Sequence, residues 1–150
     1  MPTAKGKTVP SYLFVHPVVG LPAVGLILGA FAMKTRKRYY YNLHYVTGLC
    51  AFVIAFAARS IAVWAALRAL AEGIDLARTV PTLRPHSLLA SLVFLSLLVQ
   101  TVMGLTMYLA RGTQTRVIRL HRGNARILVG LAAIILLLGL TTLILLPLRI

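Results

Sequence analysis

The stretch that decides the fold is PHSLLASLVFLSLLVQTVMGLTMYLA, residues 85–110. It contains no Asp, Glu, Lys or Arg and exceeds the ~20 apolar residues that a helix needs to cross a bilayer. Similar segments cover about residues 12–33, 42–70 and 120–148. Hydrophobic residues make up 59% of the 150-residue chain, and its mean hydropathy is +0.88. A soluble domain of this size cannot bury so much apolar surface, so the sequence predicts one membrane domain, residues 1–150, with four spanning helices.

Short connections between these segments favour an all-α fold, an up-down-up-down four-helix transmembrane bundle. Basic residues set its predicted orientation, because they stay on the cytoplasmic side of a membrane. We therefore expect the first and third connections in the cytoplasm and both termini outside, in a prokaryotic cell membrane. The cytoplasmic side then holds Lys34, Arg36, Lys37, Arg38, Arg111, Arg116, Arg119, Arg122 and Arg126, and the outer side holds Lys5, Lys7, Arg68, Arg78, Arg84 and Arg149.

The remaining composition excludes several chemistries. The two acidic residues, Glu72 and Asp75, both belong to the second connection, which leaves no carboxylate pair for glycoside hydrolysis and no di-iron carboxylate site. The single cysteine, Cys50, excludes internal disulfides, and we expect it to be a small packing residue. The net charge of +14 is concentrated at helix ends. It therefore indicates contacts with membrane lipids rather than with nucleic acid.

The chain has four histidines, and each lies near the start of a different apolar segment. In an up-down bundle, His16 and His86 share one membrane level, whereas His44 and His121 share the other. Each pair belongs to diagonally opposite helices, roughly 14 Å apart when neighbouring helices pack ~10 Å apart. Two imidazoles that reach inward can therefore meet at one metal ion, at about 2 Å from each nitrogen. Taken singly, each histidine also fits an ordinary interfacial or capping role.

Two histidines per site favour haem over zinc. Zinc prefers four ligands in a tetrahedron, and neither pair has a cysteine or carboxylate nearby. The iron of haem already has four porphyrin nitrogens and needs only two axial ligands. Four residues after each histidine, on the same helix face, stands a small residue that would leave room for a porphyrin, although small residues also serve ordinary helix packing in membranes. These residues are Gly20, Gly48, Ala90 and Ala125.

The two predicted sites are far enough apart to span most of the bilayer. His16 precedes the end of its segment by about 15 to 17 residues, which puts the two metal centres on the order of 20 Å apart along the bundle. Porphyrin rings extend several ångströms from their iron, so their edges would be near enough for electron tunnelling. The histidines thus predict a path for electrons between the two faces.

Two arginines and one amide are further candidates. Arg59 lies within the second segment, where an arginine costs about 2.5–3.5 kcal/mol on insertion scales. Its spacing from His44 turns it partly inward at the level of His16, so we expect it either to pair with a haem propionate or to extend to the interface. Arg126 is a weaker candidate at the other haem. Gln100 is more typical of an interhelical hydrogen bond than of a substrate contact.

Local sequences around the histidines resemble the four-helix core of the cytochrome b561 family. FVHPVVG around His16 resembles the Phe-x-x-His-Pro motif of that family, and LHYVTGLCAFVIAF resembles its second ligand helix. PHSLLASLVFLSLLVQTVMGL is the most specific match, and LHRGNARILVG fits the fourth ligand helix with less typical residues. The resemblance covers about residues 12–146. We expect no counterpart of the extra helix that the larger members have at each end, and Pro-His-Ser-Leu replaces their Leu-His-Ser-Trp.

The resemblance implies two b-type haems, one held by His16 and His86 and the other by His44 and His121. It also implies transmembrane electron transfer from a small-molecule or protein donor to an acceptor, with further membrane subunits or a second copy of the chain as additional partners. No catalytic residue is assigned. One alternative is a self-sufficient transmembrane reductase that uses ascorbate or quinol and a ferric or other acceptor. Another is a haem-free membrane scaffold subunit.

Overall fold

The computed structural model describes residues 9–33, 39–110 and 115–149, and these residues form helices with no strand. The predicted all-α class is therefore confirmed. The second and fourth long helices begin a few residues earlier than predicted, and the second connection contains a short helix. The elements are η1 (Ser11–Phe14), α1 (Val15–Ala32), α2 (Tyr39–Ala71), α3 (Leu76–Thr79), α4 (Leu83–Leu109) and α5 (Thr115–Arg149).

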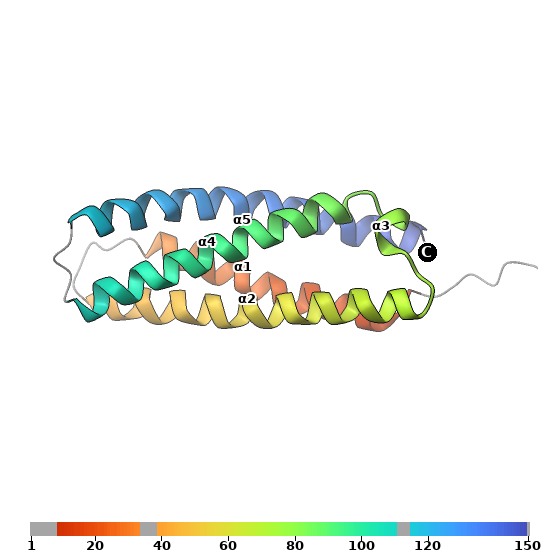
Figure 1. The fold of residues 1–150 in the computed structure, drawn as a ribbon, viewed down its shortest axis with the longest axis horizontal. Helices are drawn as coiled ribbons and strands as arrows, with labels where there is room; N and C mark the ends of the chain where they lie inside the picture. The colour runs from red at the N-terminus through yellow and green to blue at the C-terminus, as the bar shows by residue number, and fades with distance from the viewer. Residues whose placement is uncertain (1–8, 34–38, 111–114, 150) are drawn as a thin grey trace, which may run out of the picture.

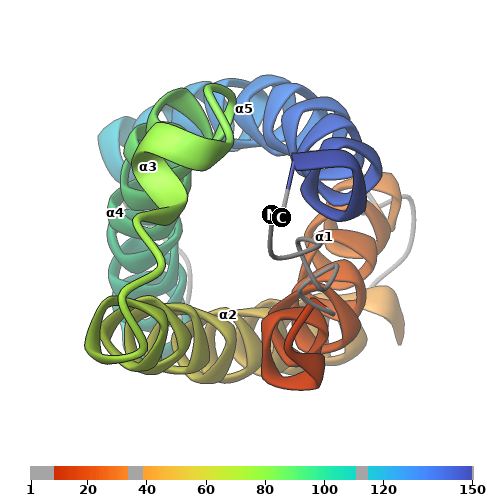
Figure 2. The same cartoon turned by 90° about the vertical axis from the view of Figure 1, so that its right-hand side faces the viewer.

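The four long helices run antiparallel to their neighbours in chain order (Figure 1). Viewed along the bundle, each tilted helix runs along one side of a square, with α1 opposite α4 and α2 opposite α5 (Figure 2). The packing agrees with this arrangement, since α1 packs mainly on α2, α4 mainly on α5, and fewer contacts join the two hairpins. The diagonal relationship assumed from the sequence is therefore present. All four long helices are apolar enough to cross a membrane.

A core lies midway along the bundle, between the two levels of histidines. Its buried residues come from all four long helices and lie seven or eleven positions after a histidine, which is two or three turns along the same helix face. The face that carries each histidine therefore turns toward the centre of the bundle. The buried cluster consists of Ile27, Ala51, Val93, Leu97, Leu128 and Ala132.

The outer surface of the bundle is apolar rather than polar. Val18, Val53, Leu95 and Leu137 are each more than half exposed, as are other large aliphatic side chains. Such a surface suits lipid, because water would disfavour so large an apolar area. Cys50 is also exposed, and its expected role as a small packing residue stays a prediction. Its neighbour Ala51 takes the inward position instead, at 1% exposure.

Helix α2 ends at a glycine whose backbone conformation favours that residue. Gly73 has a φ of 76°, in the left-handed region that side chains disfavour. The Gly73 and Ile74 amides bond back to the Leu70 and Ala69 carbonyls at 3.0 and 2.8 Å. This pair of bonds is a Schellman C-cap, which satisfies carbonyls that a helix end leaves free. The chain then turns into α3 and returns toward α4.

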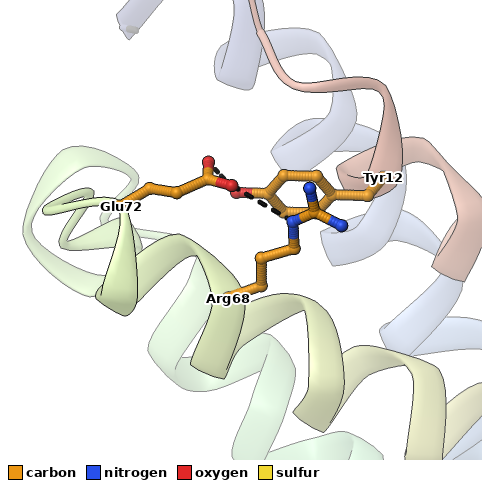
Figure 3. A network of polar contacts seen from close by, with 3 residues as sticks. All are labelled: Tyr12, Arg68 and Glu72. Atoms are coloured by element: carbon orange, nitrogen blue, oxygen red, sulfur yellow. Dashed lines mark hydrogen bonds and ion pairs between the residues drawn. The ribbon is translucent and has the colours of Figure 1, made fainter.

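A cluster of polar contacts joins η1 to the end of α2 (Figure 3). The Tyr12 hydroxyl donates to a Glu72 carboxylate oxygen at 2.7 Å, and Arg68 Nε donates to the other oxygen at 3.1 Å. The Arg68 guanidinium also lies 4.8 Å from the centre of the Tyr12 ring. We call Tyr12, Arg68 and Glu72 the terminal clamp. It holds η1 against α2 four residues before His16.

The predicted orientation depends in part on residues that the structure leaves undescribed. Lys5, Lys7, the basic run from Lys34 to Arg38, and Arg111 lie outside the described residues. Which face is cytoplasmic therefore stays a prediction.

Candidate cofactor site

The four histidines come together as two pairs in the interior of the bundle. The rings of His16 on α1 and His86 on α4 have centres 6.1 Å apart, with planes at 78°. The rings of His44 on α2 and His121 on α5 have centres 6.2 Å apart, with planes at 77°. These are the two pairs predicted from helix direction and diagonal packing. We call them the first and second histidine layers.

The spacing of each pair fits two ligands on opposite sides of one metal ion. Imidazole nitrogens bind metals at about 2.0 Å, and the ring centre lies roughly 1 Å further, so two such rings have centres about 6 Å apart. Both observed spacings match this value. Among the described residues, no group of three or more His, Cys, Asp and Glu side chains gathers at one point. The donor set is therefore two imidazoles per site, which suits an iron that has its other ligands from a porphyrin.

Two of the histidines are held by backbone carbonyls on the neighbouring helix. His16 Nδ1 lies 3.0 Å from the Ala58 carbonyl oxygen on α2, and His44 Nδ1 lies 2.7 Å from the Ala30 carbonyl oxygen on α1. A carbonyl can only accept, so in each ring Nδ1 carries the proton and Nε2 keeps its lone pair. This tautomer is the one that binds a metal through Nε2, and the carbonyl bond fixes the ring orientation. Helices α1 and α2 thus support each other's histidine.

The other hairpin supports its histidines through close contact at glycines. A Cβ atom at Gly139 on α5 would lie 3.2 Å from His86 Cε1 and 3.6 Å from His86 Nδ1. A Cβ atom at Gly104 on α4 would lie 3.7 Å from His121 Cε1. The His86 ring therefore approaches the α5 backbone so closely that only glycine fits without a shift. The Nδ1 atoms of both rings are buried and have no hydrogen-bond partner within the described part of the chain.

A chain of hydrogen bonds reaches His121 from the adjacent turns of α4 and α5. Gln100 Nε2 lies 3.0 Å from His121 Nε2, and Asn124 Nδ2 donates to Gln100 Oε1 at 2.9 Å. Asn124 Nδ2 also donates to the Ser96 backbone carbonyl at 2.9 Å, while the Ser96 hydroxyl donates to Asn124 Oδ1 at 3.0 Å. The prediction of an interhelical bond for Gln100 is confirmed. We call Ser96, Asn124 and Gln100 the amide chain.

The four predicted small residues differ in their surroundings. A Cβ atom at Gly20 would lie 3.8 Å from His16 Cε1, an ordinary contact, and one at Gly48 would meet nothing within 4 Å. Ala90 and Ala125 are half-buried. These placements are compatible with room beside the rings, and their role toward a porphyrin stays a prediction.

The predicted arginines differ in burial. Arg59 is half-buried and directly follows Ala58, whose carbonyl accepts the bond from His16. It therefore lies at the level of the first layer, and it has no hydrogen-bond or ion-pair partner among the residues that the structure describes. Arg126 is exposed. Burial thus favours Arg59 over Arg126 as a partner for an anionic group inside the bundle.

Sequence reasoning missed the residues that hold the histidines in place. The Ala30 and Ala58 carbonyls give no sequence signal, because every residue has a carbonyl. Gly139 lies inside an apolar run and looks like ordinary membrane packing. Asn124 could have been found from the sequence, since it follows His121 by three positions and so shares its helix face.

Comparison with known proteins gives no relative for this chain. No family model, no curated protein and no solved structure matches it.

Proposed function

We propose that the chain carries electrons across a membrane through two b-type haems, each held by one histidine layer. The observation that carries the proposal is the spacing of the two pairs, 6.1 and 6.2 Å between ring centres, in the interior of a bundle with four apolar helices. Haem with two histidine ligands supplies one-electron redox chemistry with no coordination position left open for substrate.

Other residues of this chain hold and orient the four histidine side chains. The Ala58 and Ala30 carbonyls keep His16 and His44 in the tautomer that presents Nε2. Gly139 lets the His86 ring lie close against the backbone of α5, where a Cβ atom would be 3.2 Å from His86 Cε1. The apolar core between the layers excludes water from the middle of the bundle.

The separation of the layers supports transfer across the membrane. The Ala30 carbonyl, which accepts from His44, lies fourteen residues beyond His16 on the same helix, so the layers are about 21 Å apart along α1. This distance is most of the ~30 Å hydrocarbon thickness of a bilayer. Each layer is therefore near one face, where a donor or an acceptor can approach.

The resemblance of the histidine motifs to the cytochrome b561 core supports the same proposal, including the pairing of the ligands. The half-buried Arg59, which has no ion-pair partner among the described residues, adds a candidate for a haem propionate at the first layer. The predicted cytoplasmic side and a prokaryotic cell membrane remain part of the proposal.

The visible spectrum of the purified full-length protein tests the proposal. After reduction with dithionite, two bis-histidine haems should give a sharp α-band and about two haems per chain. Protein that stays colourless when it is produced with added haem, or purified apoprotein that does not bind haemin, would contradict the proposal and favour the membrane scaffold. Reduction by ascorbate or a quinol, followed by addition of a ferric chelate, separates a self-sufficient reductase from a subunit that needs a protein partner.

A further inference from the structure

The amide chain has only one direction in which its hydrogen bonds can run. The backbone carbonyl of Ser96 can only accept, so the end of the Asn124 amide that faces it is the NH2 group. The second hydrogen of that NH2 group goes to the oxygen of Gln100. The other end of the Gln100 amide is then its own NH2 group, which donates to His121 Nε2. His121 therefore has its lone pair on Nε2 and its proton on Nδ1.

The bond at His121 differs in kind from the bonds at His16 and His44. In those two rings the bond is made at Nδ1, so it persists when Nε2 binds a metal. At His121 the bond is made at Nε2, which is the nitrogen with the lone pair. A metal at that nitrogen and the Gln100 amide need the same lone pair, so the hydrogen bond must break before ligation.

We propose that Gln100 competes with haem iron for His121, so that the second layer binds haem more weakly than the first and is the later of the two to load. The inference rests on the proposed function, because it concerns affinity at one of its two sites. Asn124 and Ser96 give the competition its strength, since they orient the Gln100 amide with its NH2 group toward the ring. The half-buried setting adds to it, because little water is available to replace the bond.

The size of the effect follows from the hydrogen bond that must be given up. A neutral hydrogen bond in a protein corresponds to a roughly two- to tenfold change in an equilibrium constant, and those between membrane helices fall in a similar range. Removing the amide should therefore raise the affinity of the second layer by about three- to tenfold. A residue that only supports packing would give the opposite sign, since its loss would weaken haem binding.

The test isolates the second layer with His86→Ala and titrates the full-length apoprotein in detergent with haemin. Adding Gln100→Leu should tighten binding by about three- to tenfold. Adding Asn124→Ala should tighten it less, because Gln100 remains but is no longer held. Thr101→Val is the matched control, since Thr101 is adjacent and, among the described residues, its hydroxyl bonds within α4 to the Leu97 carbonyl. This variant should leave the affinity unchanged.

Nitrogen-15 NMR of the apoprotein gives a readout that does not need haem. His121 Nε2 should show the shift of an unprotonated nitrogen that accepts a hydrogen bond, and Gln100→Leu should move it toward the value of a free lone pair. Unchanged or weaker haemin binding in Gln100→Leu, or in Asn124→Ala if the first variant fails to fold, would overturn the inference. So would a His121 Nε2 that carries the proton in the wild type. Failure of the proposed function is distinct, because the parent His86→Ala protein would then bind no haemin at all.

Discussion

The two histidine layers look equivalent in ring spacing but are supported in different ways. Both pairs have nearly perpendicular rings with centres about 6 Å apart. In the first layer, His86 lies against Gly139 with no side-chain partner among the described residues. In the second, His121 accepts a bond from Gln100 at the end of the amide chain. Helix geometry therefore sets the ring spacing in both layers, whereas the groups that contact each ring differ between them.

The largest expected effect comes from removing one ligand of each layer in turn. His86→Ala should lose the haem of the first layer and His121→Ala that of the second, so each variant should keep about one haem per chain, because each iron needs both axial ligands. The haem-to-protein ratio of the purified variants measures this. Circular dichroism checks that the helices remain. If either variant kept both haems, the pairing would be wrong.

Alanine at the two contact glycines should give effects of opposite sign. A Cβ at position 139 meets His86 at 3.2 Å, and forcing such a contact costs about 1–3 kcal/mol. A Cβ at position 104 meets His121 at 3.7 Å, an ordinary contact, so Gly104→Ala should gain roughly 0.5–1 kcal/mol from reduced chain entropy. Gly139→Ala should therefore melt below the wild type and bind haemin less well at the first layer, while Gly104→Ala should melt slightly above. Equal melting temperatures would show that the two contacts do not differ.

The two arginines should differ in their effect on the midpoint potential of a haem. Replacing the half-buried Arg59 with Gln should lower the midpoint potential of one haem, because a nearby cation favours the reduced state. We expect a shift on the order of 50 mV, where 59 mV corresponds to a tenfold change for one electron. Arg126→Gln, at the exposed position, should shift the potential less. A spectroelectrochemical titration that finds both haems unchanged in Arg59→Gln would remove Arg59 from the site.

The smallest effect on stability is expected from the terminal clamp. Hydrogen bonds from Tyr12 and then Arg68 hold the pKa of Glu72 below its ordinary value of 4.5. A lowered pKa in the folded state contributes stability above pH 4.5, and this contribution is lost as the pH falls through the lowered pKa. Glu72→Gln should melt slightly below the wild type near neutral pH, and the two melting temperatures should converge in acid. A difference that does not change with pH would exclude this role for the charge.

Much of the fold could be predicted from the sequence because membrane-spanning helices leave a strong signal. The four apolar segments, their alternating direction and the levels of the histidines all follow from length and order. The outward direction of Cys50 could not be predicted, since small residues are common on both faces of these helices. The exposed Cys50 beside the buried Ala51 depends on how α2 is rotated.

By itself, the sequence determined four helices that are apolar enough to cross a membrane, and it placed His16 with His86 and His44 with His121, given diagonal packing. Only the tertiary structure decided that the diagonals are α1 with α4 and α2 with α5 (Figure 2). It also decided which atoms hold the rings, namely the Ala30 and Ala58 carbonyls, the Gly139 backbone and the Gln100 amide. The physical reason is that a backbone carbonyl or a glycine contacts a ring only because of where it lies, and not because of its residue type. Their contacts depend on the rotation and depth of one helix against another, which the pattern of apolar residues leaves open.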